Sequence, residues 1–245
     1  MKIALLGYGK MGKVIERIAL ERGHEIVLRK TSNDSYDGLE NADVAIDFSI
    51  PDAAVGNITA CLNGNIPIVS GTTGWLEHYP KMVALCEDKK GAFIYGSNFS
   101  LGVNLFFALN ENLAKMMAQF PQYKVSMEEI HHTQKLDAPS GTAISLAKDI
   151  IENSDYSSWA LPNATPAKDD GTSKSELAKQ ILIDAKRIEN VPGTHSVFYH
   201  SDVDSIEIKH TAHSREGFAF GAVIAAEWIL GKTGVFTMKD VLNLN

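Results

Sequence analysis

The sequence is poor in cysteine and contains no long apolar run. Cys61 and Cys86 are its two cysteines, and because they show neither metal-ligand spacing nor the number needed for a disulfide framework, we interpret both as reduced structural thiols. The longest apolar stretch, Phe218 to Leu230, is interrupted by Glu227 and is shorter than the roughly 20 residues that a membrane-spanning helix needs. The sequence therefore predicts a protein with no membrane segment.

An excess of basic residues is also lacking. The formal net charge is −7, which argues against a general nucleic-acid binder because affinity for phosphate backbones comes from clustered lysine and arginine. The N-terminus reaches a glycine directly after Leu6, without the apolar core and small-residue cleavage site of a signal peptide. We therefore expect a cytoplasmic protein that binds a small molecule, with no nucleic acid and no membrane among its partners.

What is present is the pattern of a chain that alternates strands and helices. Its 245 residues, 44% of them hydrophobic and 22% charged, suffice for one large domain or two modest ones. In the first third, short apolar runs alternate with amphipathic stretches, which favours βαβ units around a parallel sheet. The predicted strands are Lys2 to Leu6, Glu25 to Leu28, Val44 to Phe48, Pro67 to Val69 and Phe93 to Tyr95, and the predicted helices run from Met11 to Ala19 and from Ala53 to Leu62.

The pattern changes near Asn98, where we expect a second domain to begin. Asn153 to Ser175 has few apolar residues and is predicted to be a long loop, whereas the apolar segment from Phe218 predicts a helix that packs back on the first domain. The other predicted elements are helices from Val103 to Met117 and from Ser140 to Ile151, a half-exposed strand from Lys124 to His132, and two strands of an open sheet, from His195 to Tyr199 and from Ser205 to His210. The expected domains are residues 1–103 with 213–245, and residues 104–212.

A glycine-rich turn follows the first predicted strand and opens the first predicted helix. Gly7, Gly9 and Gly12 form a G-x-G-x-x-G pattern that also contains Lys10 and Met11. In this context the first glycine makes a tight turn, the second lets the backbone approach a pyrophosphate, and the third allows close packing, while the helix N-terminus offers free N–H groups. A structural turn is the alternative, and the context favours a dinucleotide site.

Two basic residues follow the second predicted strand. An acidic residue at this place usually binds the ribose hydroxyls of NAD, but Arg29 and Lys30 stand here instead. A basic side chain can bind the 2′-phosphate of NADP through charge-assisted hydrogen bonds. We therefore expect NADPH to be preferred and NADH to remain possible; the alternative is that both are solvated surface residues.

Ser70 to Gly74 forms a loop of glycine and hydroxyl residues after the apolar strand that ends at Val69. Gly71, Thr72 and Thr73 would lie at the carboxyl edge of the sheet, where ligands bind in such folds. The composition alone also suits an ordinary turn. Its place after a βαβ crossover favours the ligand interpretation.

The residues best suited to chemistry lie between Glu129 and Ala143. His131, His132 and Lys135 precede a turn whose Pro139 suits a helix start, so the N–H groups and hydroxyls of the residues after it predict a carboxylate pocket. A histidine with a near-neutral pKa can supply the proton that accompanies hydride addition to a C=N carbon. The residues expected to form the anion pocket are Ser140, Gly141 and Thr142.

This segment has two other interpretations. Adjacent histidines at a strand end can be surface residues, and a Pro-Ser-Gly-Thr turn can be an ordinary helix cap. A zinc site is disfavoured, because His131 and His132 on one strand would point to opposite faces and no further zinc motif accompanies them. We therefore expect no metal.

Several segments together resemble the 4-hydroxy-tetrahydrodipicolinate reductase family, formerly called dihydrodipicolinate reductase. The most specific is His131-His132-x-x-Lys135-x-Asp137-Ala138-Pro139-Ser140-Gly141-Thr142-Ala143. Further matches, in the family's order, are Gly7 to Gly12, Asp47-Phe48-Ser49, Gly71-Thr72-Thr73-Gly74, Ser97-Asn98-Phe99-Ser100-x-Gly102-Val103-Asn104 and Val191-Pro192-Gly193-Thr194-His195. The similarity spans nearly the whole chain.

The resemblance implies an α/β fold with a Rossmann-like nucleotide-binding domain, an α+β substrate domain whose open mixed sheet builds a homotetramer, and hinge closure between them. It implies reduction of 4-hydroxy-tetrahydrodipicolinate to tetrahydrodipicolinate with NADPH or NADH, on the route to diaminopimelate and lysine. The implied roles are His131 as general acid, Lys135 as a substrate-holding and catalytic residue, His132, Ser140, Gly141 and Thr142 as carboxylate ligands, Arg215 and Phe218 as nicotinamide-side or hinge contacts, and Gly71, Thr72, Thr73, Ser97, Asn98 and Phe99 as cofactor contacts.

The chain departs from the family at two places. Thr133 and Gln134 stand where many members carry arginine and histidine, which reduces the local positive charge, and the acidic residue after the second strand is absent. Two other functions remain open: an amino-acid or aspartate-type dehydrogenase, and a dinucleotide-sensing regulator without chemistry. The segment from His131 to Thr142 argues against both.

Overall fold

The computed structural model describes residues 1–32, 34–162, 179–214 and 216–244, and it divides into two compact units. The first unit comprises Met1–Asn104 and Glu216–Asn245, and the second comprises Leu105–Arg215. Arg215, the expected nicotinamide-side contact, lies outside the described residues, and so do residues 163–175 of the expected loop. Within the described residues, no helix has the length and apolar character needed to cross a membrane.

The first unit is built on a six-stranded parallel sheet, which we name sheet A. Its strand order is β11-β5-β4-β3-β1-β2, so the chain starts in the interior of the sheet and fills both sides by crossovers. A parallel sheet of this kind needs helical crossovers on its faces. The strands are β1 (Lys2–Leu6), β2 (Glu25–Lys30), β3 (Val44–Asp47), β4 (Ile68–Ser70), β5 (Ala92–Tyr95) and β11 (Gly234–Phe236).

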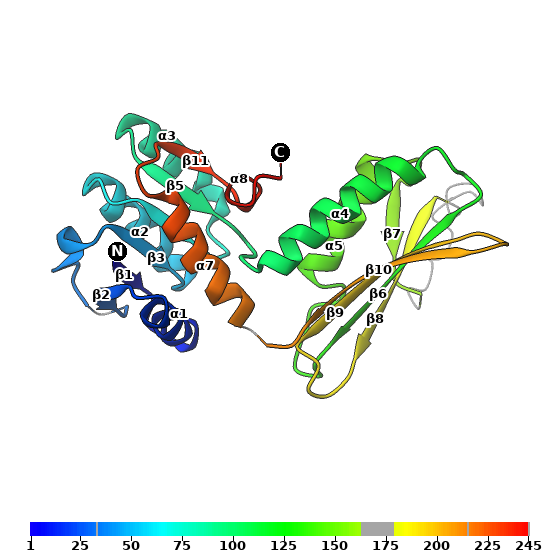
Figure 1. Ribbon diagram of the computed structural model, residues 1–245, viewed down its shortest axis with the longest axis horizontal. Coiled ribbons are helices and arrows are strands. Elements are labelled where there is room, and N and C mark those ends of the chain that lie inside the picture. The colour runs from blue at the N-terminus through cyan, green and yellow to red at the C-terminus, as the bar shows by residue number, and fades with distance from the viewer. Residues whose placement is uncertain (33, 163–178, 215, 245) are drawn as a thin grey trace. The chain divides into compact units, whose positions relative to one another are not determined.

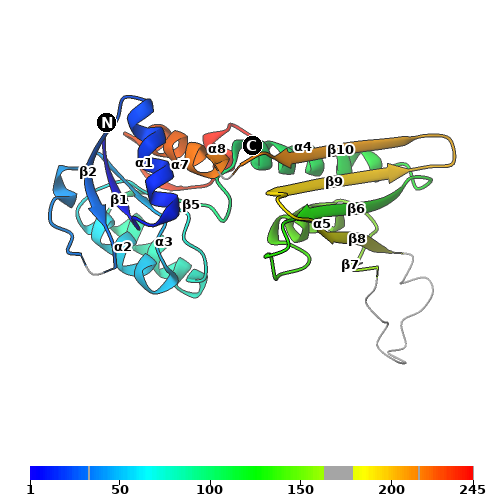
Figure 2. The same cartoon turned by 90° about the horizontal axis from the view of Figure 1, so that it is seen from below.

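Helices cover both faces of sheet A (Figure 2). Alternate strand residues point to opposite faces and pack against different helices. Ile3 and Leu5 pack against α1 (Lys10–Glu21) and α7 (Glu216–Ile229), whereas Ala4 and Leu6 pack against α2 (Pro51–Asn63) and α3 (Tyr79–Asp88). The prediction that the apolar segment from Phe218 returns to the first unit is confirmed. The short helices are η1 (Leu39–Asn41), η2 (Leu76–His78) and α8 (Met238–Val241).

The second unit contains a five-stranded mixed sheet, which we name sheet B, in the order β10-β9-β6-β8-β7. β9 pairs antiparallel with both β10 and β6, whereas β6, β8 and β7 run parallel to one another. The strands are β6 (Lys124–His131), β7 (Ser158–Ala160), β8 (Gln180–Arg187), β9 (Gly193–His200) and β10 (Ser205–Ala212). The predicted fold class, with a Rossmann-like sheet and an open mixed sheet, is confirmed.

Two helices, α4 (Leu101–Met117) and α5 (Gly141–Glu152), pack on one face of sheet B (Figure 1). On β6, Val125 and Met127 face these helices and are buried, and Glu129 and His131 follow them on the same face. The alternation that predicts a half-exposed strand therefore buries the carboxylate of Glu129 and the imidazole of His131 on the same face of β6. These two side chains belong to the candidate site of the second unit.

The structure also corrects several predicted boundaries. β2 extends to Lys30, so Arg29 and Lys30 belong to the strand and point to opposite sides of it. β7 lies inside the segment expected to be a loop, because its backbone pairs with β8 even though it is only three residues long. α3, β8 and β11 have no counterpart among the predicted elements, since their apolar patterns are short and tertiary pairing stabilises them.

Candidate active site

In the first unit, the glycines between β1 and α1 serve two different purposes. A Cβ added to Gly7, whose φ is +103°, would overlap the backbone of Phe48, and one added to Gly12 would overlap the carbonyl oxygen of Gly7. A Cβ at Gly9 would meet no atom within 4 Å. The fold therefore requires glycine at the first and third positions, whereas the open space beside Gly9 suits a ligand.

The N-terminus of α1 offers donors to that space. Gly9 is its N-cap in an extended conformation, and no side chain of the described residues caps the helix. The first-turn N–H groups, those of Lys10 and Met11 among them, lack intrahelical acceptors and carry the positive end of the helix dipole. An adjoining cavity of about 300 Å³ is lined by Gly7, Tyr8, Gly9, Lys30, Thr31, Ser32, Phe48, Ser49, Ile50, Ala53 and Asn57. These features fit a dinucleotide phosphate.

The structure separates the two basic residues of β2. Lys30 is 7% exposed and lines the cavity, where its Nζ donates to the carbonyl oxygen of Thr31 at 3.0 Å and lies 4.8 Å from the ring centroid of Tyr36. Arg29 is exposed, and its Nε donates to Glu16 at 2.8 Å. This ion pair lowers the pKa of Glu16. Lys30 is therefore the basic residue placed at the cavity.

A buried polar network supports the opposite wall of the cavity. The carboxylate of Asp47, at the end of β3, is fully buried and accepts hydrogen bonds from Ser49 Oγ (2.7 Å), Asn57 Nδ2 (2.8 Å) and Ser70 Oγ (2.7 Å). Burial raises the pKa of Asp47, and the three donors oppose that effect. The hydroxyl of Thr72 accepts from the N–H of Ser49 at 2.8 Å, which ties the loops after β3 and β4 together.

The other expected cofactor residues take different positions in this unit. A Cβ on Gly71 would overlap the ring of Phe48, so close packing explains this glycine. Thr73 and Ser97 are exposed, Asn98 and Phe218 are half-buried, and Asn98 accepts a hydrogen bond from the N–H of Ser100 at 2.9 Å. The ring of Phe99 is 1% exposed and packs in the core against Phe48, so its side chain supports the site from beneath.

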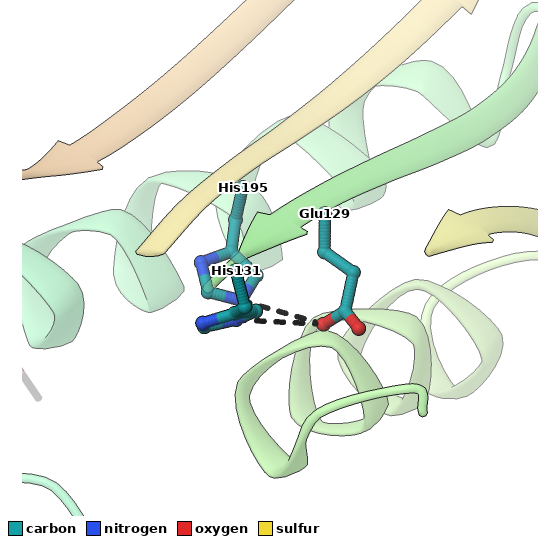
Figure 3. Close-up of side chains that lie close together, drawn as sticks. All are labelled: Glu129, His131 and His195. Carbon is teal, nitrogen blue, oxygen red and sulfur yellow. Dashed lines mark hydrogen bonds and ion pairs between the residues drawn. The ribbon is translucent and has the colours of Figure 1, made fainter. Parts of the chain in front are cut away.

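In the second unit, the buried face of β6 ends in Glu129 and His131, and His195 lies opposite them on β9 (Figure 3). The carboxylate of Glu129 accepts from the N–H of Ser140 at 2.9 Å and from Arg187 Nη2 at 3.1 Å. Glu129 is fully buried. Its charge is therefore compensated by a guanidinium and by the backbone that starts α5.

The rings of His131 and His195 lie edge to face, with their centroids 5.0 Å apart. Their Nε2 atoms are 3.3 Å apart, and each lies 3.7 Å from Oε2 of Glu129. Burial lowers the pKa of His195 to about 4, and the neighbouring His131 adds to this effect. Burial also lowers the pKa of His131, whereas the charge of Glu129 opposes the shift. Both rings are therefore mainly neutral at pH 7.

Lys135 and the turn before α5 lie next to these histidines in the chain. Lys135 is three-quarters buried and donates to Asp137 at 2.8 Å, which lowers the pKa of Asp137. Arg187 holds the same turn, because its Nε donates to the carbonyl oxygen of Lys135 at 3.2 Å. His132 follows the end of β6 and is half-buried. The structure thus gathers the predicted residues of this segment around one turn.

The start of α5 provides the predicted anion pocket with donors. Ser140 is its N-cap and accepts from the N–H of Ala143 at 3.2 Å, and its hydroxyl lies 3.1 Å from His195 Nε2. A Cβ on Gly141 would meet no atom within 4 Å, and Thr142 is half-exposed. The N–H groups of Gly141 and Thr142 lie in the first turn, so they are available to an anion.

Glu129, His131 and His195 are also residue types that bind metals, and their ligand atoms lie within 4.8 Å of one another. The donor set argues for a different role. Arg187 Nη2 already binds Oε1 of Glu129 and the N–H of Ser140 donates to Oε2, so the charge of the carboxylate is compensated and a cation would be repelled by the guanidinium beside it. We therefore interpret the cluster through its hydrogen bonds.

Four residues of this site were not assigned roles from the sequence: Glu129, Arg187, Gly193 and His195. Glu129 lies two residues after the buried Met127, and His195 lies two residues before the buried Val197. This alternation is the sequence signal that could have shown that both side chains are buried. Arg187 lies on a strand that was not predicted. Gly193 is explained by contact with the His131 ring, since an added Cβ would lie 2.9 Å from its Cε1, and no sequence pattern reveals that contact.

Comparison with known proteins bears on the whole chain. The sequence profile of the dihydrodipicolinate reductase N-terminus matches residues 1–99, and that of the dihydrodipicolinate reductase C-terminus matches residues 102–242. A 4-hydroxy-tetrahydrodipicolinate reductase of Christiangramia forsetii is 54% identical over 99% of this chain and 98% of that protein. One from Thermosipho africanus is 33% identical, with the same coverage.

Solved structures show the same fold. A dipicolinate-bound dihydrodipicolinate reductase from Paenisporosarcina sp. TG-14 matches with a TM-score of 0.72 at 23% identity, covering 97% of each chain. A probable dehydrogenase from Thermotoga maritima matches with a TM-score of 0.58 at 10% identity, covering 100% of this chain and 93% of that chain. Together with both sequence profiles and the full-length relatives, these matches confirm the predicted resemblance: the chain belongs to the dihydrodipicolinate reductase family, that of the 4-hydroxy-tetrahydrodipicolinate reductases.

Proposed function

We infer that this protein reduces 4-hydroxy-tetrahydrodipicolinate to tetrahydrodipicolinate, with loss of water and at the expense of a nicotinamide cofactor. The observation that carries this conclusion is the 54% identity to a 4-hydroxy-tetrahydrodipicolinate reductase along nearly the full length of both chains. The gathering of His131, Lys135 and Ser140 around one turn supports it chemically. The reaction serves the synthesis of diaminopimelate and lysine, and we place it in the cytoplasm, whose reducing conditions suit two buried free cysteines.

The two units divide the work in this proposal. Residues 1–104 and 216–244 bind the dinucleotide, because the uncapped α1, the open space beside Gly9 and the adjoining cavity all belong to them. Residues 105–214 hold the substrate and carry the oligomer contacts. The boundaries expected from the sequence, at 103 and 213, differ from these by one to three residues.

NADPH is the preferred cofactor in this proposal, and Lys30 selects it. Its ammonium is held at the cavity, where no carboxylate of the described lining residues would repel a 2′-phosphate. Ser32 adds a hydroxyl at the same wall, whereas the hydroxyl of Thr31 donates to Asp34 at 2.6 Å. Arg29 contributes less, because its guanidinium is already paired with Glu16. NADH lacks the phosphate that Lys30 would bind, so it remains a weaker alternative.

The substrate's two carboxylates are bound by the start of α5 and by the residues before it. The N–H groups of Gly141 and Thr142 and the hydroxyl of Ser140 receive one carboxylate, as helix N-termini do. Lys135 and His132 supply charge and a further hydrogen bond. Lys135 suits this role because, among the residues that the structure describes, its ammonium pairs with the exposed side chain of Asp137, which a substrate carboxylate can replace.

Catalysis combines hydride and proton transfer. NADPH, when bound, supplies the hydride, and the protein must supply the proton that balances it. His131 is the proton donor in this proposal, because burial holds the pKa of the other imidazole, His195, near 4. A bound dianionic substrate favours the protonated ring, so the acid is charged when it is needed.

We further propose a homotetramer assembled through the open face of sheet B. Leu182 is half-exposed there, and a hollow of about 270 Å³ is lined by Ser126, Met127, Glu128, Pro162, Leu182, Asp184, Phe198 and His200. Lys186 pairs with Glu128 and Asp184, so the face carries both charges and can be self-complementary across a twofold axis. Leu182→Glu should reduce the molar mass in light scattering, whereas Leu20→Glu on exposed α1 should not; an unchanged tetramer in the first variant contradicts the assembly.

The test of the reaction is oxidation of NADPH by purified protein when a synthase generates the substrate from pyruvate and aspartate semialdehyde. We expect oxidation to depend on the synthase and His131→Gln to lower turnover by roughly 10²-fold, with cofactor affinity unchanged. Tight NADPH binding without any oxidation would instead favour a sensor. A thermal shift with pyridine-2,6-dicarboxylate makes the same distinction, since only a substrate pocket gains stability from it.

A further inference from the structure

Glu129 and His195 lie beside His131, the proton donor of the proposed reaction. We propose that they are positioning residues, which hold His131 in one tautomer and one orientation and determine how readily it takes up and keeps the proton it delivers. The inference rests on the proposed function. The three side chains are buried and lie close together, as Figure 3 shows.

The His131 ring is held on three sides. Its Nδ1 lies 3.3 Å from the carbonyl oxygen of Pro192, its Nε2 lies 3.3 Å from His195 Nε2, and its Cε1 edge packs on the backbone of Gly193. Any side chain at Gly193 would press on the ring, because a Cβ would lie 2.9 Å from Cε1. Rotation of the ring is therefore blocked by backbone as well as by hydrogen bonds.

These contacts also fix the tautomer. A carbonyl oxygen can only accept, so Nδ1 of His131 carries the proton and the neutral ring presents a lone pair at Nε2. His195 must then donate from its own Nε2. The Nδ1 of His195 is buried and has no hydrogen-bond partner within the described residues. That nitrogen can hold the proton instead, which frees Nε2 of His195 to accept from a protonated His131.

Glu129 provides the charge that a protonated His131 needs. Its Oε2 lies 3.7 Å from Nε2 of both histidines, and its position is fixed by Ser140 and Arg187. The charged or titratable groups that face the pair are Glu129 on β6, Arg187 on β8, His210 on β10, and Lys135 after β6. Three of these four disfavour a second proton, and only Glu129 favours it.

The balance among these groups predicts that substrate binding is coupled to proton uptake. The positive charges of Lys135 and Arg187 oppose protonation of His131 in the free protein. A bound dicarboxylate compensates those charges, and Glu129 then stabilises the imidazolium. The pair therefore gains a proton when the pocket fills, and this is the proton that the reaction consumes.

Glu129→Gln is the decisive variant, since it keeps the shape and an acceptor for Ser140 and Arg187 but removes the charge. A general acid must be protonated, so activity falls as pH rises through its pKa. Without the carboxylate that fall should occur about one pH unit lower, which gives roughly a tenfold loss at pH 8 and a much smaller loss at pH 6. Glu152→Gln, an exposed carboxylate on α5, should keep the wild-type profile.

Two outcomes would overturn the proposal. A uniform loss of activity at every pH in Glu129→Gln would mean a structural role, and an unchanged profile would mean none. A second measurement does not depend on turnover: calorimetry of pyridine-2,6-dicarboxylate binding to the wild type at pH 7, in buffers of different ionisation enthalpy. We expect uptake of up to one proton, reduced in Glu129→Gln; binding without uptake contradicts the coupling even if the enzyme is active.

If Glu129→Gln fails to fold, the imidazole ¹⁵N shifts of the wild type still test the tautomers. We expect His131 to be protonated on Nδ1 and His195 on Nε2 near pH 7, and the opposite pattern would refute the arrangement. Failure of the proposed function would appear differently, as absence of NADPH oxidation or of dicarboxylate binding in the wild type.

Discussion

At the scale of single residues, the glycines after β1 show how one motif combines fold and ligand requirements. Gly7 and Gly12 are dictated by backbone contacts within the protein, whereas the space beside Gly9 is open. The G-x-G-x-x-G spacing is visible in the sequence. Which glycines the fold requires and which one leaves space for a ligand depends on the atoms that approach each Cα.

That division can be tested with two alanine variants. Gly9→Ala should leave the melting temperature nearly unchanged but weaken NADPH binding by about tenfold, because a methyl group enters the space for the pyrophosphate. Gly12→Ala should lower the melting temperature by several degrees through its overlap with Gly7. Calorimetric unfolding and fluorescence titration measure the two effects, and a destabilised Gly9→Ala protein with normal NADPH affinity would reverse the assignment.

Lys30 and Arg29 provide a second matched pair. Lys30→Gln should raise the KM for NADPH by about tenfold while that for NADH changes little, because the lost charge faces only the 2′-phosphate. Arg29→Gln should have a smaller effect, since Arg29 is already bound to Glu16. Steady-state kinetics with both cofactors decide the matter; equal losses with NADPH and NADH in Lys30→Gln would show that Lys30 does not discriminate between them.

At the scale of elements, the start of α5 links the fold to the substrate pocket. Ser140 caps the helix, lies against His195 and donates its N–H to Glu129, so one residue joins β6, β9 and α5. In the sequence, Pro139 and the residues after it indicate that a helix starts here. The two strands that the cap contacts could not be read from the sequence, because both lie far away in the chain.

The cap contributes to stability and to binding, and these contributions can be separated. Ser140→Ala should cost about 1 kcal/mol of stability and weaken pyridine-2,6-dicarboxylate binding by severalfold. Thr237→Ala removes a cap from α8 in the other unit and should cost a similar stability with no effect on that ligand. Chemical denaturation and calorimetry provide the two readings. If both variants bind pyridine-2,6-dicarboxylate with equal affinity, Ser140 is not part of the substrate pocket.

At the scale of the whole molecule, the buried histidines link stability to pH. The pKa of His195 falls from 6.5 to about 4 in the folded protein, and the pKa values of His131 and His210 are also lowered. Between pH 6.5 and about 4, His195 therefore binds a proton in the unfolded chain but not in the folded protein. Stability is therefore fully present above pH 6.5 and is lost as pH falls toward 4.

We expect His195 alone to account for about 2 kcal/mol of lost stability between pH 7 and pH 5. His195→Gln should lose less stability over that interval than the wild type, whereas His78→Gln, an exposed histidine, should behave like the wild type. Unfolding temperatures at the two pH values measure this. A His195→Gln protein with the full wild-type pH dependence would show that His195 titrates normally.

The sequence by itself determined what depends on local pattern. The first strands and helices, the nucleotide turn, the helix start after Pro139 and the family all follow from periodicity, capping residues and short motifs. For Phe99, the motif position predicts a cofactor contact but does not show that its ring is buried in the core.

Only the tertiary structure decided which distant residues meet. The pairing of β6 with β8 and β9 brings Arg187, Gly193 and His195 to Glu129 and His131, and the length of β2 assigns Lys30 to the cavity and Arg29 to Glu16. The physical reason is that strand pairing and register arise from contacts between segments far apart in the chain, which local sequence preferences do not encode.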